Sequence, residues 1–121
     1  MKIRIRGNSV RYRLTRTEVE TFCKEGSYND ETHFDAQTFI YRLVAKEGIS
    51  GLEASFDNNT ITLYLPLEET KVWATSNRVG YQNTIPLQNG GQLQLLVEKD
   101  FVCMDETVED QSDNYPNPKA L

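Results

Sequence analysis

The chain opens with Met1-Lys2-Ile3-Arg4-Ile5-Arg6-Gly7-Asn8-Ser9-Val10-Arg11-Tyr12-Arg13-Leu14-Thr15-Arg16-Thr17. Apolar and basic residues alternate in this stretch, first up to Arg6 and again from Val10 to Leu14. Because successive side chains of a β-strand point to opposite faces, the alternation predicts two strands, each with an apolar face and a basic face. Gly7 and Asn8 tolerate positive φ and are typical of a turn. The two strands are therefore expected to form a hairpin or to follow each other around a bend.

Positive charge is concentrated in this opening stretch. Residues 1–17 hold six of the thirteen basic side chains and no acidic one, whereas the remainder carries seven basic and eighteen acidic groups. The formal net charge of the whole chain is −5, which argues against a general affinity for nucleic acid. A local basic patch is compatible with this total, because salt screens charges over about 10 Å.

A helix is predicted directly after the second strand. Thr15 is expected to cap it while Glu18 reaches back to the cap, which is the capping-box pattern. Apolar residues then recur at helical spacing, at Val19, Phe22 and Cys23. Gly26 accepts the left-handed conformation that ends helices, so the helix is expected over residues 16–25, with Cys23 in the core.

The rest of the chain shows mainly the alternation of strands. The further elements expected are a long strand from Glu31 to Ala45, strands at 52–56, 60–65, 79–85 and 92–97, and a helix from about Pro66 to Ala74. Asp57-Asn58-Asn59 predicts a turn between two of these strands, and Gln88-Asn89-Gly90-Gly91 predicts another. The order is ββαβββαββ, and short connections favour antiparallel pairing. The predicted class is α+β, with an antiparallel curled sheet or small partly open barrel and two helices.

The composition changes near residue 103. Residues 1–103 are expected to form a single domain, and the acidic, proline-containing segment 104–121 is expected to be a disordered tail. Cys23 and Cys103 are far apart and show no metal or redox spacing, which indicates a reducing compartment. The chain has no export signal and no apolar run of about twenty residues, so a cytoplasmic location without membrane contact is expected.

Arg4, Arg6, Arg11 and Arg13 form the candidate site. One interpretation is structural: these arginines pair with acidic neighbours such as Glu98, Asp100 or Glu53 on adjacent strands. A second is anion binding, because the planar guanidinium matches phosphate and carboxylate and stays charged at any working pH. A third has the acidic tail cover the arginines until a stronger anion displaces it. The preferred hypothesis is a non-enzymatic binding module for an anionic small molecule or an acidic protein segment.

Two other classes of function remain open at this stage. The alternating arginines have a faint likeness to a strand pair of the triphosphate tunnel enzymes, which implies a metal-dependent phosphohydrolase. That family's Glu-rich opening strand is missing here, since the chain starts Met1-Lys2-Ile3. A structural or assembly protein would instead bury an exposed strand edge in a homodimer.

No cofactor or metal is expected. His33 is the one histidine of the chain, and it shares a predicted strand face with Asp35, as an acid–base pair would, although a surface position is the simpler interpretation. One histidine and two distant cysteines provide no zinc ligand set. The acidic residues of the tail lack the spacing of a calcium loop.

Two blocks of sequence carry a family resemblance. They are Lys2-Ile3-Arg4-Ile5-Arg6-Gly7-Asn8-Ser9-Val10-Arg11-Tyr12-Arg13-Leu14, and Glu98-Lys99-Asp100-Phe101-Val102-Cys103 with Asp110-Gln111-Ser112-Asp113-Asn114-Tyr115-Pro116-Asn117-Pro118. In these blocks the chain resembles a family of short bacterial proteins of unknown function. The resemblance extends over nearly the full length and implies a bacterial cytoplasmic protein, but it implies no activity and no site.

Overall fold

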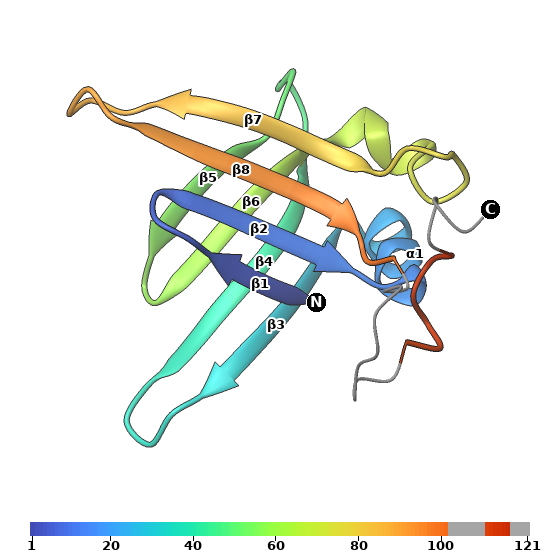
Figure 1. The fold of residues 1–121 in the computed structure, drawn as a ribbon, viewed down its shortest axis with the longest axis horizontal. Coiled ribbons are helices and arrows are strands. Elements are labelled where there is room, and N and C mark those ends of the chain that lie inside the picture. The colour runs from blue at the N-terminus through green and yellow to red at the C-terminus, as the bar shows by residue number, and fades with distance from the viewer. Residues whose placement is uncertain (102–110, 117–121) are drawn as a thin grey trace.

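Two four-stranded sheets pack face to face in the computed structural model, which describes residues 1–101 and 111–116 (Figure 1). Sheet A contains β1 (Lys2–Ile5), β2 (Ser9–Leu14), β8 (Gln92–Lys99) and β7 (Gly80–Pro86), in that order. Sheet B contains β3 (Ser27–His33), β4 (Thr38–Lys46), β6 (Thr60–Pro66) and β5 (Glu53–Asp57), in that order.

Both sheets have the same plan. Each is built from two antiparallel hairpins, β1–β2 and β7–β8 in sheet A and β3–β4 and β5–β6 in sheet B. Within each sheet the two hairpins join through a parallel pair of central strands, β2 with β8 and β4 with β6. The hairpin turns follow local signals: Gly7 has a φ of 54°, and Asn58 and Asn59 both have positive φ.

The helix α1 (Arg16–Glu25) confirms the capping prediction. The Thr15 side chain accepts a hydrogen bond from the Glu18 amide, and the Glu18 carboxylate accepts one from the Thr15 amide at 2.8 Å. Gly26 ends the helix with a φ of 82°. α1 lies at one end of the space between the sheets (Figure 1). Its side chains Val19 and Phe22 are completely buried there and close that end of the core.

The hydrophobic core lies between the inner faces of the two sheets. Sheet A contributes Tyr12, Leu95 and Val97, and sheet B contributes Leu43, Leu63 and Leu65, all fully buried. Trp73, from the segment between β6 and β7, makes T-shaped ring contacts with Phe22 and Tyr81. Burial of these side chains removes apolar surface from water and provides the main driving force for folding.

The predicted fold class is wrong in three respects. The described residues contain one α-helix, because the segment after Pro66 forms only the short 3-10 helix η1 (Leu67–Lys71) followed by turns. The single long strand predicted from Glu31 to Ala45 is instead the hairpin of β3 and β4, and β3 was missed as a strand of its own because its sequence is too polar to show apolar alternation. The sheets are not purely antiparallel, and they form an open two-layer sandwich in place of a single curled sheet or barrel.

Residues 111–116, within the segment expected to be a tail, lie against α1: the Thr17 hydroxyl donates to the Asp113 carboxylate at 3.0 Å. The other residues of that segment, and Cys103, lie outside the described part. No helix in the described ranges has the length and apolar character needed to cross a membrane.

Candidate anion-binding face

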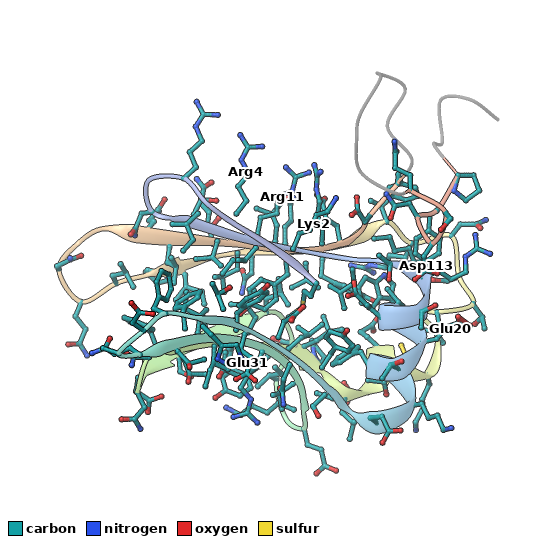
Figure 2. The ribbon with its side chains drawn as sticks, turned by 90° about the horizontal axis from the view of Figure 1, so that it is seen from below. Lys2, Arg4, Arg11, Glu20, Glu31 and Asp113 are labelled. Carbon is teal, nitrogen blue, oxygen red and sulfur yellow. The ribbon has the colours of Figure 1, made fainter. Side chains whose placement is uncertain are left out.

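The predicted site residues share the outer face of sheet A. We define the basic face as the side chains of Lys2, Arg4, Arg6, Arg11 and Arg13 on β1, β2 and the turn between them. Their apolar neighbours in the alternation, such as Tyr12 and Leu14, are completely buried on the inner face. Figure 2 shows Lys2, Arg4 and Arg11 on the side of sheet A that faces away from sheet B.

Strand register brings like charges directly opposite each other. Lys2 pairs with Arg13 across β1 and β2, and Arg4 pairs with Arg11. Directly opposite residues have Cβ atoms about 5 Å apart, and same-face residues follow each other along a strand at about 7 Å. The cations therefore form a ladder of two columns. Such like-charge pairs oppose folding unless another charge compensates them.

Glu98 compensates part of this charge. Its carboxylate, on the neighbouring strand β8, accepts hydrogen bonds from the guanidinium groups of both Arg11 and Arg13. The Glu98 side chain is 17% exposed, so water screens these ion pairs only in part. Ion pairing with an acidic neighbour, one of the interpretations of the sequence, is thus confirmed for Arg11 and Arg13.

Asp100 provides a second carboxylate at the end of sheet A. The Lys2 ammonium lies 3.0 Å from the Asp100 carboxylate, whose side chain is 4% exposed. Glu53, which was also considered as a partner, lies in sheet B and pairs with Lys46 at 3.2 Å. The described carboxylates near the basic face are therefore committed to Lys2, Arg11 and Arg13.

Arg4 and Arg6 differ from the other members of the basic face. Both side chains are exposed, and neither forms an ion pair or a side-chain hydrogen bond with a residue in the ranges 1–101 and 111–116. Arg4 also stands directly across from Arg11. The two guanidinium groups thus present their donors to solvent at the edge of sheet A, in a form that an external anion can accept.

One protein-family model matches nearly all of the chain, including the basic face. The model of the family of unknown function DUF7009 matches residues 1–119. The chain belongs to this family. No curated protein and no solved structure matches this DUF7009 chain significantly, so the family assignment brings no activity with it.

Other candidate chemistry receives less support in this DUF7009 chain. His33 contacts Thr38 at 3.1 Å and Glu31 at 3.6 Å, and not Asp35, so the considered acid–base pair is not formed. Among the described residues no group of three or more His, Cys, Asp or Glu side chains is placed to hold a metal ion.

Sequence reasoning did not identify a second cationic position, at Lys99. This side chain is 4% exposed, and its ammonium donates to the Ser76 carbonyl at 2.8 Å and lies 4.9 Å from the centre of the Tyr115 ring. Burial lowers the pKa of Lys99, and burial raises the pKa of the nearby Cys23 thiol. The alternation that places Val97 on the inner face also predicts an inward Lys99, so the signal was present.

A cleft of about 630 Å³ lies next to this lysine. It is lined by residues of α1, of the segment before β7 and of the region around Tyr115, including Arg16 and Glu20. The Arg16 guanidinium lies 5.1 Å from the centre of the Tyr115 ring. The Tyr115 ring thus lies over the buried Lys99 ammonium, which already has its partners within the protein. The basic face is therefore the stronger candidate site.

Proposed function

We propose that this protein is a non-enzymatic binding module whose basic face recognises an anionic partner. The observation that carries the proposal is the pairing of like charges: Lys2 with Arg13 and Arg4 with Arg11, on one exposed face. Where no carboxylate compensates it, as at Arg4, cross-strand repulsion costs such a pair about 0.2–1 kcal/mol relative to a neutral pair. A bound anion removes that cost and adds charge-assisted hydrogen bonds, which are about twice as strong as neutral ones.

The chemistry of the face supports a phosphate or carboxylate partner. Arginine carries a rigid fork of donors that binds either group through two parallel hydrogen bonds, and four of the five cations of the basic face are arginines. Two classes of partner fit this chemistry, a phosphorylated small molecule and an acidic protein segment. We place this binding in the cytoplasm, the location expected from the sequence.

Nucleic acid fits the face less well. Single-strand binders combine positive charge with aromatic side chains on which bases stack. Tyr12, the aromatic residue between Arg11 and Arg13, is completely buried, and its hydroxyl donates to the Ile61 carbonyl at 2.9 Å. The net charge of −5 also opposes a general attraction to a polyanion.

The triphosphate-tunnel alternative requires arginines and carboxylates that converge inside a closed barrel. Here the arginines lie on the outer face of an open sandwich. The carboxylate of Glu98 forms ion pairs with Arg11 and Arg13, and it belongs to no group of three or more His, Cys, Asp or Glu side chains among the described residues that could hold a metal ion. This geometry favours binding over metal-dependent hydrolysis.

Thermal unfolding with tripolyphosphate as the probe tests the proposal. A ligand that binds the native state raises the unfolding midpoint by an amount that grows with its concentration and its affinity. We expect the wild-type midpoint to rise, and the variant Arg4→Gln with Arg11→Gln to lose most of that rise. The matched control, Arg42→Gln with Lys46→Gln, removes the same charge from the outer face of sheet B and is expected to respond like wild type.

Two results would count against the proposal. One is the absence of any midpoint change for wild type up to millimolar tripolyphosphate at low salt. The other is an equal response from both double variants, because the anion would then act on total charge and not on the basic face. A requirement for magnesium would revive the hydrolase alternative and call for an assay of phosphate release.

A further inference from the structure

The basic face ends at the outer edge of β1. β1 is the outermost strand of sheet A and pairs only with β2 among the described strands. The Arg6 amide donates to the Ser9 carbonyl at 3.1 Å, so Arg6 belongs to a hydrogen-bonded pair. Because such pairs alternate along antiparallel strands, the backbone groups of Ile3 and Ile5 point away from β2. No described residue outside β2 pairs with their amides and carbonyls, so these groups form an edge that can accept another strand.

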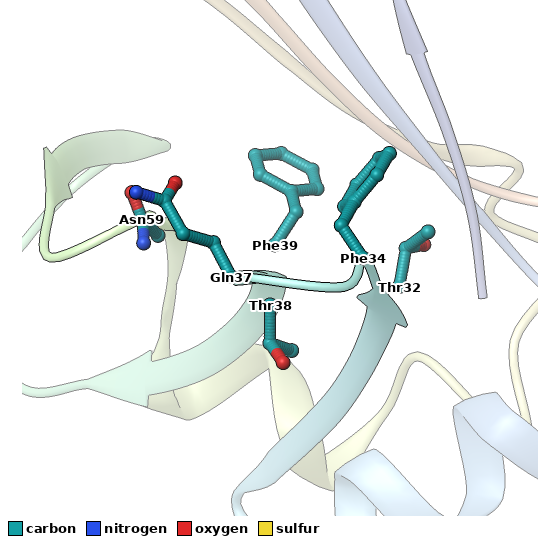
Figure 3. A pocket seen from close by; sticks show the side chains of 6 residues that line it. All are labelled: Thr32, Phe34, Gln37, Thr38, Phe39 and Asn59. Atoms are coloured by element: carbon teal, nitrogen blue, oxygen red, sulfur yellow. The ribbon is translucent and has the colours of Figure 1, made fainter.

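Apolar side chains lie on the part of sheet B that extends past this edge (Figure 1). Sheet B extends beyond β1 in Figure 1, where the β3–β4 hairpin projects past the edge of sheet A. Figure 3 shows Phe34 and Phe39 of this hairpin on one side of it and Thr38 on the other. Phe39 stacks on the largely buried Tyr41, at 6.0 Å between ring centres, which identifies this side as the inner face.

The exposure of these groups is large for inner-face positions. Phe34 is 66% exposed and Ile5, on the inner side of β1, is 56% exposed. Phe34 and Phe39 also line a hollow of about 360 Å³. The inner face of sheet B therefore extends beyond β1, the last strand of sheet A (Figure 1). A further strand beside β1 would lie over this extended part of the face.

The outer side of the same edge is positively charged. Lys2, Arg4 and Arg6 follow each other on β1 and the turn after it, and all three are exposed. A strand added beside β1 would place alternate side chains opposite these cations, at about 5 Å, and the intervening ones over the uncovered aromatic rings. The edge thus specifies both the conformation and the residue pattern of what binds there.

We propose that the partner is an extended protein segment with alternating acidic and apolar residues, which adds to sheet A as a fifth strand beside β1. This inference rests on the proposed anion-binding function and specifies its partner class. The backbone of Ile3 and Ile5 provides the main-chain hydrogen bonds, as in other cases of strand addition. The acidic side chains face Lys2, Arg4 and Arg6, and the apolar ones cover Phe34 and Phe39.

A second copy of the same chain does not suit this edge. Two β1 strands paired edge to edge would place Lys2 and Arg4 of one copy against the cations of the other. Directly opposed like charges destabilise a strand pair. Charge complementarity therefore selects an acidic segment over a symmetric dimer.

Binding of synthetic peptides to the full chain tests this inference. The probe is acetyl-Glu-Val-Glu-Val-Glu-Val-Glu-amide, and its control, acetyl-Glu-Glu-Val-Val-Glu-Glu-Val-amide, has the same composition without the alternation. We expect the alternating peptide to bind about tenfold more tightly than its control, measured by titration calorimetry, because only a regular alternation matches both sides of the edge. Its binding should also protect the amides of Ile3 and Ile5 from hydrogen exchange.

Matched variants separate the parts of the proposed contact. Ile5→Pro removes an amide that faces the incoming strand and leaves the ladder with β2 complete, so peptide affinity should fall at least about tenfold. Tripolyphosphate binding should persist in this variant. Phe34→Ser should weaken the peptide several-fold, whereas Val72→Ser, a change at another exposed apolar residue, should leave peptide binding unaltered.

The outcomes distinguish this inference from the function on which it rests. If tripolyphosphate binds but the two peptides bind equally, or if Ile3 and Ile5 gain no protection, strand addition is wrong and the anion-binding function stands. If neither tripolyphosphate nor either peptide binds, both are wrong. If Ile5→Pro fails to fold, the exchange measurement on wild type still decides.

Discussion

The two sheets of this protein share one plan and differ in their outer faces. On sheet B, the basic groups have partners within the sheet: Lys46 pairs with Glu53, and Arg42 donates to the Asn29 side chain at 3.1 Å. On sheet A, Arg4 and Arg11 stand opposite each other, and Arg4 has no described partner. Sheet B therefore shows that this strand arrangement folds when the basic groups of its outer face have partners within the sheet. The like-charge pair of Arg4 and Arg11 opposes folding, and for that reason we propose that it serves binding.

The largest expected effect is the loss of stability when a core leucine on the inner face of either sheet is truncated. Leu95 of sheet A and Leu63 of sheet B are both completely buried in the common core. Leu95→Ala and Leu63→Ala should each lower the free energy of unfolding by about 2–5 kcal/mol, through lost burial and the cavity left behind. Denaturant unfolding should show one cooperative transition in each variant. Separate transitions for the two sheets would contradict a shared core.

The next largest effect is expected at alkaline pH, where tyrosines on the inner faces of both sheets ionise. Burial raises the pKa of Tyr12 on sheet A, and burial together with the Glu18 carboxylate raises the pKa of Tyr28 on sheet B to about 12. A phenol whose pKa is raised in the folded state contributes stability that is complete below its ordinary value of about 10. Stability should therefore fall between about pH 10 and pH 12. Ultraviolet absorbance should show these tyrosines ionising late; ordinary titration of all tyrosines would be inconsistent with this layer.

The outer face of sheet A should respond to the loss of its shared carboxylate. Glu98→Gln leaves Arg11 and Arg13 without their ion-pair partner, so the free energy of unfolding should fall by about 1–3 kcal/mol. The same change frees two more guanidinium groups and should increase the affinity for tripolyphosphate. Calorimetric titration measures the second effect. A weaker affinity would mean that Glu98 orients the arginines for binding.

The smallest effect concerns the opposed arginines themselves. Arg4→Thr removes a like-charge pair with Arg11 and inserts a residue that favours strands, so stability should rise by about 0.2–1 kcal/mol while anion affinity falls. Arg42→Thr on sheet B loses a hydrogen bond with Asn29 and should not stabilise the protein. Equal changes in the two variants, measured by denaturant unfolding, would remove the distinction between the outer faces.

Local signals in the sequence predicted much of the fold. The capping box at Thr15 and Glu18, the Gly26 stop and the turn at Asn58 and Asn59 all appear as expected, because each depends on residues close in sequence. The alternation in the first strands also identified the basic side chains and the buried Tyr12. These features needed no knowledge of distant contacts.

The errors concern features that depend on long-range pairing. β3 is a strand because it pairs with β4, and its inner-face Asp30 accepts a hydrogen bond from the Met1 amino group at 2.8 Å. Neither contact leaves an apolar pattern in the local sequence. The parallel pairing of β2 with β8 joins residues 85 positions apart, such as Ser9 and Gln94, and alternation within a strand does not specify which strand lies beside it.

The candidate site was predictable only in part for the same reason. Alternation placed Arg4, Arg6, Arg11 and Arg13 on one face, but it could not show that Glu98 serves Arg11 and Arg13. That assignment depends on β8 being the neighbour of β2. The free edge of β1 beside an uncovered aromatic hairpin is likewise a property of the assembled sandwich.

Chemical-shift mapping of the arginine side chains tests the central claim most directly. Tripolyphosphate would be titrated into the full chain while the guanidinium Nε–Hε resonances are followed by NMR. The account predicts that Arg4, Arg6, Arg11 and Arg13 shift together and saturate with one affinity, while Arg42 on sheet B stays unchanged. Shifts spread equally over Arg42 and the basic face, or no shifts at all, would contradict it.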